Sequence, residues 1–162
     1  MADTEPDTGP DTRSDTGPDT GPLPTTPALP ALPAGARRLC AAHELVEGGV
    51  GVRFTVAVGG REIGAFAVRY EGQVHGYLNQ CAHVPMELDW QEGHFFESSG
   101  LYLMCATHGA TYAPDSGLCV GGPCRGASLA KLRVEERDGA VYWIPESPYD
   151  DPPSLPSPPP VP

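Results

Sequence analysis

The chain has 162 residues, with 20 prolines, 20 glycines and a formal net charge of −11 at pH 7. That length allows one ordinary domain, and the acidity argues against nucleic acid, which selects basic surfaces. No run of about eighteen apolar residues occurs, so no membrane span is expected. The N-terminus lacks a basic segment followed by an apolar one, so we expect no export signal and predict a cytoplasmic protein.

The composition divides the chain into three segments. Residues 1–36 are rich in Asp, Thr, Gly and Pro, and residues 146–162 are mostly Pro, Ser and Asp. Neither composition buries enough apolar surface to offset the entropy lost on folding, so both are predicted to be disordered tails. Residues 37–145 are long enough for one core. The acidic charge lies mostly in the tails, where it either keeps the protein soluble or serves in docking.

The middle segment begins with three strand patterns. Apolar and polar residues alternate over residues 52–58, which is the two-residue period of a half-buried strand. Gly59-Gly60 then predicts a turn. A further turn at Glu71-Gly72 separates the second strand from a third over residues 73–79.

Shorter strand signals follow. Leu101–Met104 is a short apolar run. Asp138-Gly139 lies between strand-like runs at 132–137 and 140–144, and an Asp-Gly pair in that position is a strong hairpin signal. Turn signals recur along the segment, and no helix longer than a turn or two is visible. The predicted fold class is therefore all-β, a sandwich or a barrel.

Two short motifs carry the chemistry. The first is Cys81-Ala82-His83, and the second is Cys105-Ala106-Thr107-His108. Each pairs one thiolate with one imidazole directly after a predicted strand, so two such loops together supply a Cys2His2 ligand set. Zinc accepts that set, but short zinc fingers usually place both cysteines on one knuckle and both histidines on a helix. One ligand of each kind per loop suits a binuclear cluster, in which one iron takes both cysteines and the other takes both histidines.

These motifs resemble the Rieske family of [2Fe–2S] proteins. Cys-x-His stands at residues 81–83 and Cys-x-x-His-Gly at residues 105–109. The stretch Gly121-Gly122-Pro123 resembles the family's third, proline-containing loop, which covers the cluster. The resemblance spans about residues 40–145. It implies a Rieske fold of three small antiparallel sheets, with a cluster-binding subdomain inserted in a basal β subdomain.

The resemblance also implies one [2Fe–2S] cluster and a role for each site residue. Cys81 and Cys105 would bind the inner iron as thiolates. His83 and His108 would bind the outer iron, with their ring edges reaching solvent. Tyr112 stands at the place of the family's tyrosine donor, and Pro123 stands in the covering loop. No residue is implied to be catalytic, so we expect an electron carrier rather than an enzyme.

Two departures from the respiratory members of the family, at three positions, show which members the chain resembles less. Those proteins join their two cluster loops by a disulfide, whereas this chain has Met86 and Thr107 at the two positions. They also place a serine where this chain has Ala110. Fewer hydrogen-bond donors stabilise the reduced cluster less, whereas Tyr112 keeps the place of one donor. We therefore expect a reduction potential between the two extremes of the family, nearer the low end.

The chain therefore resembles the soluble Rieske-type ferredoxins of bacterial oxygenase systems. That resemblance implies two partners, a flavoprotein reductase and a terminal oxygenase or another redox protein, and no nucleic acid or membrane. Two alternatives stay open. One is a Rieske subunit or regulatory module of a larger enzyme, such as the small subunit of a nitrite reductase, and the other is a structural zinc domain.

The remaining residues of chemical interest have simpler interpretations. Three histidines lack a cysteine partner at ligand spacing and are expected on the surface or in strands: His43, His75 and His94. Cys40 is expected as a small buried residue of a first strand. Trp90 and Trp143 are expected in the core or covering it. Cys119 and Cys124 flank the third loop and could face each other, either as a disulfide or as packing residues.

Overall fold

The computed structural model describes residues 31–150. Within that range the regular structure is β-strand apart from one short 3₁₀ turn, which confirms the all-β class. The turn η1 is Ala42–Glu44, and the strands are β1 Arg37–Ala41, β2 Val52–Val58, β3 Arg61–Tyr70, β4 Gln73–Leu78, β5 Leu103–Met104, β6 Thr111–Tyr112, β7 Cys119–Gly121, β8 Lys131–Leu132, β9 Val134–Arg137, β10 Ala140–Trp143 and β11 Tyr149–Asp150. Among the described residues no helix is long and apolar enough to cross a membrane.

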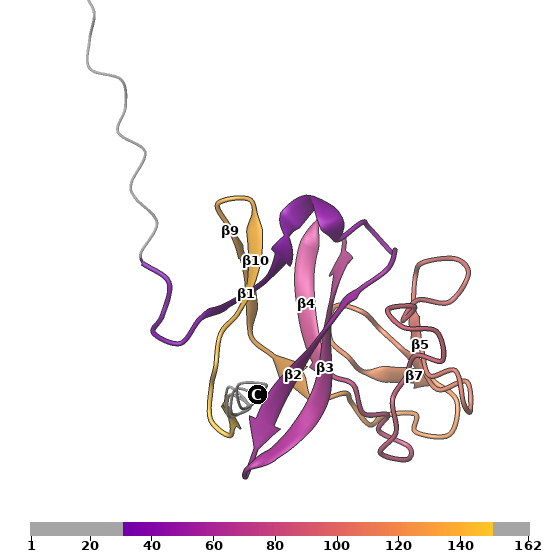
Figure 1. Ribbon diagram of the computed structural model, residues 1–162. Helices are drawn as coiled ribbons and strands as arrows, with labels where there is room; N and C mark the ends of the chain where they lie inside the picture. Colours follow the sequence, from indigo (N-terminus) through magenta and orange to yellow (C-terminus); the bar gives the residue numbers. More distant parts are fainter. Residues whose placement is uncertain (1–30, 151–162) are drawn as a thin grey trace, which may run out of the picture. The chain divides into compact units, whose positions relative to one another are not determined.

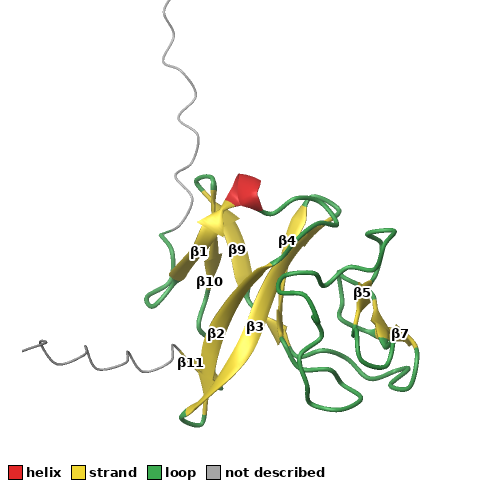
Figure 2. Cartoon of the chain, turned by 45° about the vertical axis from the view of Figure 1, so that its right-hand side comes forward, coloured by secondary structure: helices red, strands yellow, loops and turns green. Residues whose placement is uncertain are grey.

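The strands form three antiparallel sheets, as the family resemblance implies (Figure 1). The central sheet has the order β11-β2-β3-β4-β8, and a second sheet has the order β1-β10-β9. The third sheet, β5-β6-β7, is built from much shorter strands joined by long loops. It lies on the opposite side of β3 and β4 from β1, β9 and β10 in both views (Figure 2). The small sheet and its loops thus form a separate lobe on the edge of a basal β structure.

Tight turns fix the register of the long strands. Gly59-Gly60 joins β2 to β3 with positive φ at both residues, and Val58 pairs with Arg61 across the turn. Glu71-Gly72 and Asp138-Gly139 also have positive φ at both positions. This is the conformation of a two-residue type I′ turn, whose twist matches that of the strands it connects. The two predicted turns and the predicted hairpin at Asp138-Gly139 are confirmed.

Aromatic side chains attach the small lobe to the central sheet. Phe66 on β3 stacks on Phe95, with ring centroids 3.8 Å apart. The Tyr77 hydroxyl, on β4, donates to the Pro114 carbonyl at 2.8 Å. The Tyr77 ring also lies against Gly117, where a Cβ would come within 2.7 Å of it. The lobe is therefore held by stacking, a buried hydrogen bond and a close backbone approach.

The outcomes for the other expected core residues differ. Cys40 is buried in β1 and Trp143 is buried in β10, as predicted. The prediction for Trp90 is wrong, because its side chain is 91% exposed. The physical reason is the turn it occupies, in which the buried Asp89 carboxylate accepts the Gly93 N–H at 2.9 Å. This contact directs Asp89 inward and leaves Trp90 on the outside.

The described fold continues past residue 145, where the C-terminal tail was predicted to begin. Tyr149 and Asp150 of β11 pair with Val58 and Ala57 of β2. Arg133 also forms an ion pair with Glu146 at 3.0 Å. The rest of the predicted C-terminal tail and almost all of the N-terminal one lie outside the described residues.

Truncation tests these boundaries. A protein of residues 31–150 should melt within a few degrees of the full chain, because the outer segments have compositions that bury little apolar surface. A protein of residues 31–147 should melt several degrees lower, because it loses the pairing of β11 with β2. A loss of about 1 kcal/mol lowers the melting temperature of a domain this size by roughly 4–8 °C. Calorimetry on both proteins measures this. A melting temperature of the 31–150 protein far below that of the full chain would show that an outer segment packs on the core.

Candidate metal centre

The first cluster loop, residues 80–88, follows β4 and is closed by a buried amide. The Asn79 side-chain carbonyl accepts the Leu88 N–H at 2.8 Å, and its NH2 group donates to the Asp89 carboxylate at 2.8 Å. Inside the loop the Cys81 N–H donates to the Met86 carbonyl at 2.9 Å. The loop is therefore closed at its base and again beside the cysteine.

The second cluster loop, residues 105–110, connects β5 to β6. The Cys105 N–H donates to the Ala110 carbonyl at 2.8 Å, and the Gly109 N–H donates to the Cys105 carbonyl at 2.9 Å. Gly109 has φ of +69°, a conformation that favours glycine. The Ala106 N–H donates to the Leu88 carbonyl at 2.8 Å, so the second loop is hydrogen-bonded directly to the end of the first.

The four predicted ligands come together as two pairs. Cys81 and Cys105 are buried, and the two thiols lie close enough to influence each other's pKa. His83 and His108 are exposed, and their rings meet edge to face at a centroid distance of 5.0 Å and an interplanar angle of 87°. Within residues 31–150 no three potential ligands gather as they would around a single metal ion. A pair of thiols and a pair of imidazoles is the donor set that two irons with two protein ligands each require.

Tyr112, on β6, lies beside the thiol pair. Its buried hydroxyl is 3.1 Å from the Cys81 sulfur, accepts the Ala82 N–H at 3.1 Å and is 3.2 Å from the Cys124 sulfur. Burial, together with the hydrogen bonds to Cys124 and Cys81, raises the pKa of this phenol well above its ordinary value. Tyr112 therefore keeps its proton at any physiological pH and can donate it to a sulfur.

The two buried thiols differ in acidity. Burial alone would raise the pKa of Cys81, but hydrogen bonds from the Tyr112 hydroxyl and from the backbone N–H groups of His83 and Val84 outweigh it, so that pKa is lowered. Burial raises the pKa of Cys105, and the backbone hydrogen bonds of its loop offset this only in part. Hydrogen bonds to the charged form favour a thiolate, which is the form that binds a metal. The surroundings of Cys81 thus favour its role as a ligand.

The third loop lies against the second. Gly122 has φ of +87°, and a Cβ at that position would come within 2.9 Å of the Ala110 Cα. The loop can therefore approach the backbone of the second cluster loop only with glycine at this position. Pro123 follows Gly122 and is exposed.

The sequence analysis missed the polar group that positions the first loop. Asn79 and Asp89 are buried, and Arg53 on β2 lies 3.8 Å from the Asp89 carboxylate. Arg53 also pairs with Glu87 of the same loop at 2.6 Å. The available signal was Asn79 itself, a polar residue at the end of the predicted strand over residues 73–79 and two residues before Cys81.

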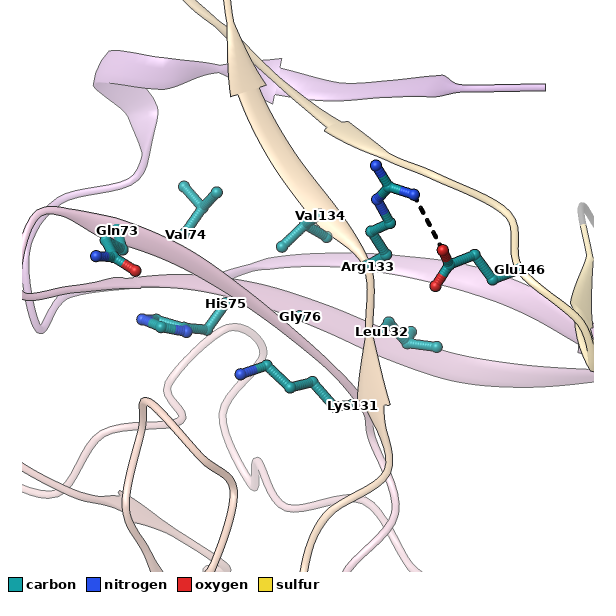
Figure 3. A pocket seen from close by; sticks show the side chains of 9 residues that line it. All are labelled: Gln73, Val74, His75, Gly76, Lys131, Leu132, Arg133, Val134 and Glu146. Atoms are coloured by element: carbon teal, nitrogen blue, oxygen red, sulfur yellow. Dashed lines mark hydrogen bonds and ion pairs between the residues drawn. The ribbon is translucent and has the colours of Figure 1, made fainter. Parts of the chain in front are cut away.

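A groove elsewhere on the molecule contains none of the predicted ligands. It has a volume of about 460 Å³ and is lined from β4, β8 and β9, with the Arg133–Glu146 ion pair at one end (Figure 3). His75 lines it, and burial, followed by the charge of Lys131, lowers the pKa of that imidazole. His75 therefore sits on a strand away from the thiols, and His43 and His94 are exposed, as expected.

Comparison with solved structures finds similar folds in oxygenase systems. The terminal oxygenase of carbazole 1,9a-dioxygenase from Novosphingobium sp. KA1 matches with a TM-score of 0.53 and 22% identity, over 67% of this chain and 29% of that chain. A reduced complex between oxygenase and ferredoxin of a carbazole 1,9a-dioxygenase matches with a TM-score of 0.52 and 18% identity, over 67% of this chain and 27% of that one. This chain thus spans less than a third of those chains.

In a third structure, one chain is matched over nearly its whole length. That structure is a complex of reduced oxygenase and oxidised ferredoxin of carbazole 1,9a-dioxygenase, with a TM-score of 0.52, 22% identity and coverage of 67% of this chain and 92% of the matched chain. At these identities the likeness establishes the fold. No curated protein matches the sequence.

The family model for the Rieske [2Fe–2S] domain matches residues 36–145, which is most of the chain. Its range contains both cluster loops and the third loop, and the buried thiol pair and exposed imidazole pair have the chemistry that such a cluster requires. The chain belongs to the Rieske [2Fe–2S] domain family and binds one [2Fe–2S] cluster.

Proposed function

We propose that this protein is a ferredoxin that carries single electrons between redox proteins, with Cys81, Cys105, His83 and His108 holding its cluster. The observation that carries the proposal is the exposure of the two imidazole rings, 5.0 Å apart, on the same two loops that bury the two thiols. The cluster, when bound, takes up one electron and releases it again. The protein then holds one side of the site away from water and leaves the histidine side open to a partner.

Each group around the thiols has a role in this proposal. Cys81 and Cys105 bind the inner iron as thiolates. Tyr112 donates its phenol proton to the Cys81 sulfur, whose negative charge grows on reduction. Gly122 seats the third loop on Ala110, and Pro123 covers that side of the site from the same loop. In this proposal the site transfers an electron and converts no substrate.

The surface around the imidazoles suits a transient partner. Val84 and Met86, in the same loop as His83, are 42% and 39% exposed. Apolar side chains beside an exposed electron-transfer site can be covered by a partner without leaving a buried charge unpaired. Weak electron-transfer complexes bury little surface, and a few such side chains are enough for them.

The nearly complete match to one chain of an oxygenase–ferredoxin complex supports the ferredoxin proposal, since that chain is little longer than the domain. In that role the partners are a flavoprotein reductase and a terminal oxygenase. The alternative is a Rieske component of a larger enzyme. This alternative is favoured by the two matched chains of which this chain covers only 27% and 29%, because in them the domain is part of a longer protein.

Metal analysis and substitution test the ligand set. The purified protein should contain about two irons and two acid-labile sulfides per chain. Replacing Cys81, His83, Cys105 or His108 by Ala should abolish the visible absorption of the cluster. Each change should also lower the melting temperature, because metal binding is part of the folding free energy of the two loops.

Matched controls make this test specific. Cys40→Ala removes a buried cysteine and His94→Ala removes an exposed histidine, and neither should change the iron content. One zinc per chain without sulfide, in protein produced with ample iron, would instead identify the structural zinc domain. A cluster of unchanged spectrum in His108→Ala would contradict the ligand assignment.

The reduction potential of the cluster should depend on Tyr112. A hydrogen bond to a charged group contributes about 1.5–3 kcal/mol, and about 1.4 kcal/mol corresponds to about 59 mV for one electron. Loss of the bond in Tyr112→Phe should therefore lower the potential by tens of millivolts while the cluster stays bound. Ala110→Ser should raise the potential if its hydroxyl reaches a sulfur. Protein-film voltammetry measures both, and an unchanged potential in Tyr112→Phe would reduce Tyr112 to a packing residue.

Electron exchange with a partner should take place at the surface formed by the two cluster loops, residues 80–88 and 105–110. Protein reduced with dithionite should give one electron per chain to cytochrome c. The reduction of cytochrome c is followed by stopped-flow absorption in high salt. Met86→Asp should slow this second-order reaction several-fold without changing the potential, because docking would then bury a charge. Val46→Asp, a change at an exposed residue between η1 and β2, is the control. Equal rates for the two variants would argue against docking on the cluster loops.

A further inference from the structure

Two cysteines outside the ligand set lie in contact beside the cluster site. The Cys124 thiol donates to the Cys119 sulfur at 2.8 Å. A disulfide has an S–S bond of about 2.05 Å, so a closure of about 0.8 Å separates the pair from a covalent bond. Both residues carry free thiols in this structure. No part of the proposed electron-transfer site uses their sulfurs as ligands.

The backbone around the two thiols is already closed into a hairpin. The Cys119 N–H donates to the Ala127 carbonyl at 2.7 Å, and the Ala127 N–H donates to the Cys124 carbonyl at 2.8 Å. The Gly126 N–H donates to the Cys119 carbonyl at 2.9 Å. A covalent bond between the sulfurs would therefore need no refolding of the chain. It would close so short a loop that its gain in chain entropy is small, which argues against a purely structural staple.

The pair also lies at the base of the third loop. Residues 120–123 run between the two cysteines, and Gly122 within them rests on Ala110 of the second cluster loop. The Cys119 thiol donates to the Gly121 carbonyl at 3.1 Å. A bond between the sulfurs consumes this thiol proton and fixes both ends of the loop.

Tyr112 connects the pair to the proposed ligand Cys81. Its hydroxyl is 3.2 Å from the Cys124 sulfur and 3.1 Å from the Cys81 sulfur. The hydroxyl oxygen also accepts a hydrogen bond from the Ala82 N–H. The Cys124 proton points to Cys119, so the Cys124 sulfur is an acceptor for Tyr112. One phenol proton is thus shared between two sulfurs, one in the thiol pair and one in the ligand set.

We propose that Cys119 and Cys124 form a reversible dithiol–disulfide couple that sets the potential of the cluster through the Tyr112 hydroxyl. This inference rests on the proposed role of Cys81 as a ligand. When the disulfide forms, the Cys124 sulfur becomes a weaker acceptor, and Tyr112 donates its proton to Cys81 alone. The reduced cluster gains stabilisation, so the cluster potential rises.

The chemistry balances with a small-molecule disulfide as the oxidant. The Cys124 sulfur attacks one sulfur of oxidised glutathione, which breaks its S–S bond and releases one glutathione. The Cys119 sulfur then attacks Cys124 in the mixed disulfide and releases the second glutathione. The two cysteine protons and two electrons end on the two glutathione thiols.

Accessibility decides which thiol reacts first. Cys124 is 8% exposed and Cys119 is 1% exposed, so the oxidant enters at Cys124. Burial, followed by the hydrogen bond with Cys124, raises the pKa of the Cys119 thiol. Because the thiolate is the attacking species, the exchange should be slow, and equilibrium requires incubation for hours.

The first measurement follows the thiols of the full holoprotein directly. The protein is equilibrated without oxygen in glutathione buffers of increasing oxidised fraction, quenched in acid, alkylated and digested. We expect a peptide in which Cys119 is linked to Cys124, and it should revert in reduced glutathione. Full alkylation of both cysteines in the most oxidising buffer would overturn the proposed couple.

The second measurement is the cluster potential of the same samples. It should be higher in the disulfide form, and the coupling must be reciprocal. A tenfold coupling amounts to about 59 mV on the one-electron cluster and about 30 mV on the two-electron thiol couple. A disulfide that forms without raising the potential would overturn the link through Tyr112.

Variants separate this link from other effects of the oxidant. In Cys119→Ala and Cys124→Ala the potential should no longer respond to the glutathione buffer, whereas Cys40→Ala should respond as the unaltered protein does. In Tyr112→Phe the disulfide should still form, but the potential should not follow it. If instead no cluster spectrum appears in any thiol state, the proposed function fails, and that result is distinct from a failure of the couple.

Discussion

The hydrogen bond from the Ala106 N–H to the Leu88 carbonyl holds together two loops that are far apart in the sequence. Each loop supplies one thiol and one imidazole, so neither can hold a binuclear cluster alone. Ordering the backbone costs about 1–2 kcal/mol per residue, and polar loops bury little apolar surface to offset that cost. The bonds inside each loop and the buried Asn79–Asp89 pair supply part of the compensation. Binding of the metal supplies the rest, which makes cofactor and lobe one cooperative unit.

The four proposed ligands differ in how deeply they are buried. Cys81 and Cys105 lie in the hydrophobic core of the lobe together with Phe95 and Tyr112, whereas His83 and His108 reach solvent. In the core a single phenol proton can favour negative charge on sulfur, because little water competes with it. At the surface the imidazoles of His83 and His108, the proposed ligands of the outer iron, are accessible to a partner without any opening of the fold.

The features predicted best from the sequence are those that depend on a few neighbouring residues. The type I′ turns at Glu71-Gly72 and Asp138-Gly139 need only two residues to be recognised, and each ligand motif is equally short. The ligand set itself stays a proposal. The prediction that Trp90 lies in the core or covers it is wrong, because its exposure depends on the contact of Asp89 with Gly93, and aromatic character alone gives no sign of that turn. Asn79, Arg53 and β11 act across distant parts of the chain, so the strand and loop patterns did not reveal them. The spacing of Cys119 and Cys124 indicated that their side chains could face each other. It did not indicate the contact with Tyr112 that links them to Cys81.

The closure of the first loop by Asn79 has a consequence for the speed of electron exchange. A loop tied at Leu88, at Asp89 and again between Cys81 and Met86 has little room to relax when its charge changes. With the proposed ligand set, the inner contribution to the reorganisation energy is then small, and most of the remainder comes from water around the rings of His83 and His108. A docked protein displaces that water, so contact itself lowers the activation barrier. Exchange would be slow with small hydrated ions and fast with macromolecules that cover the loops.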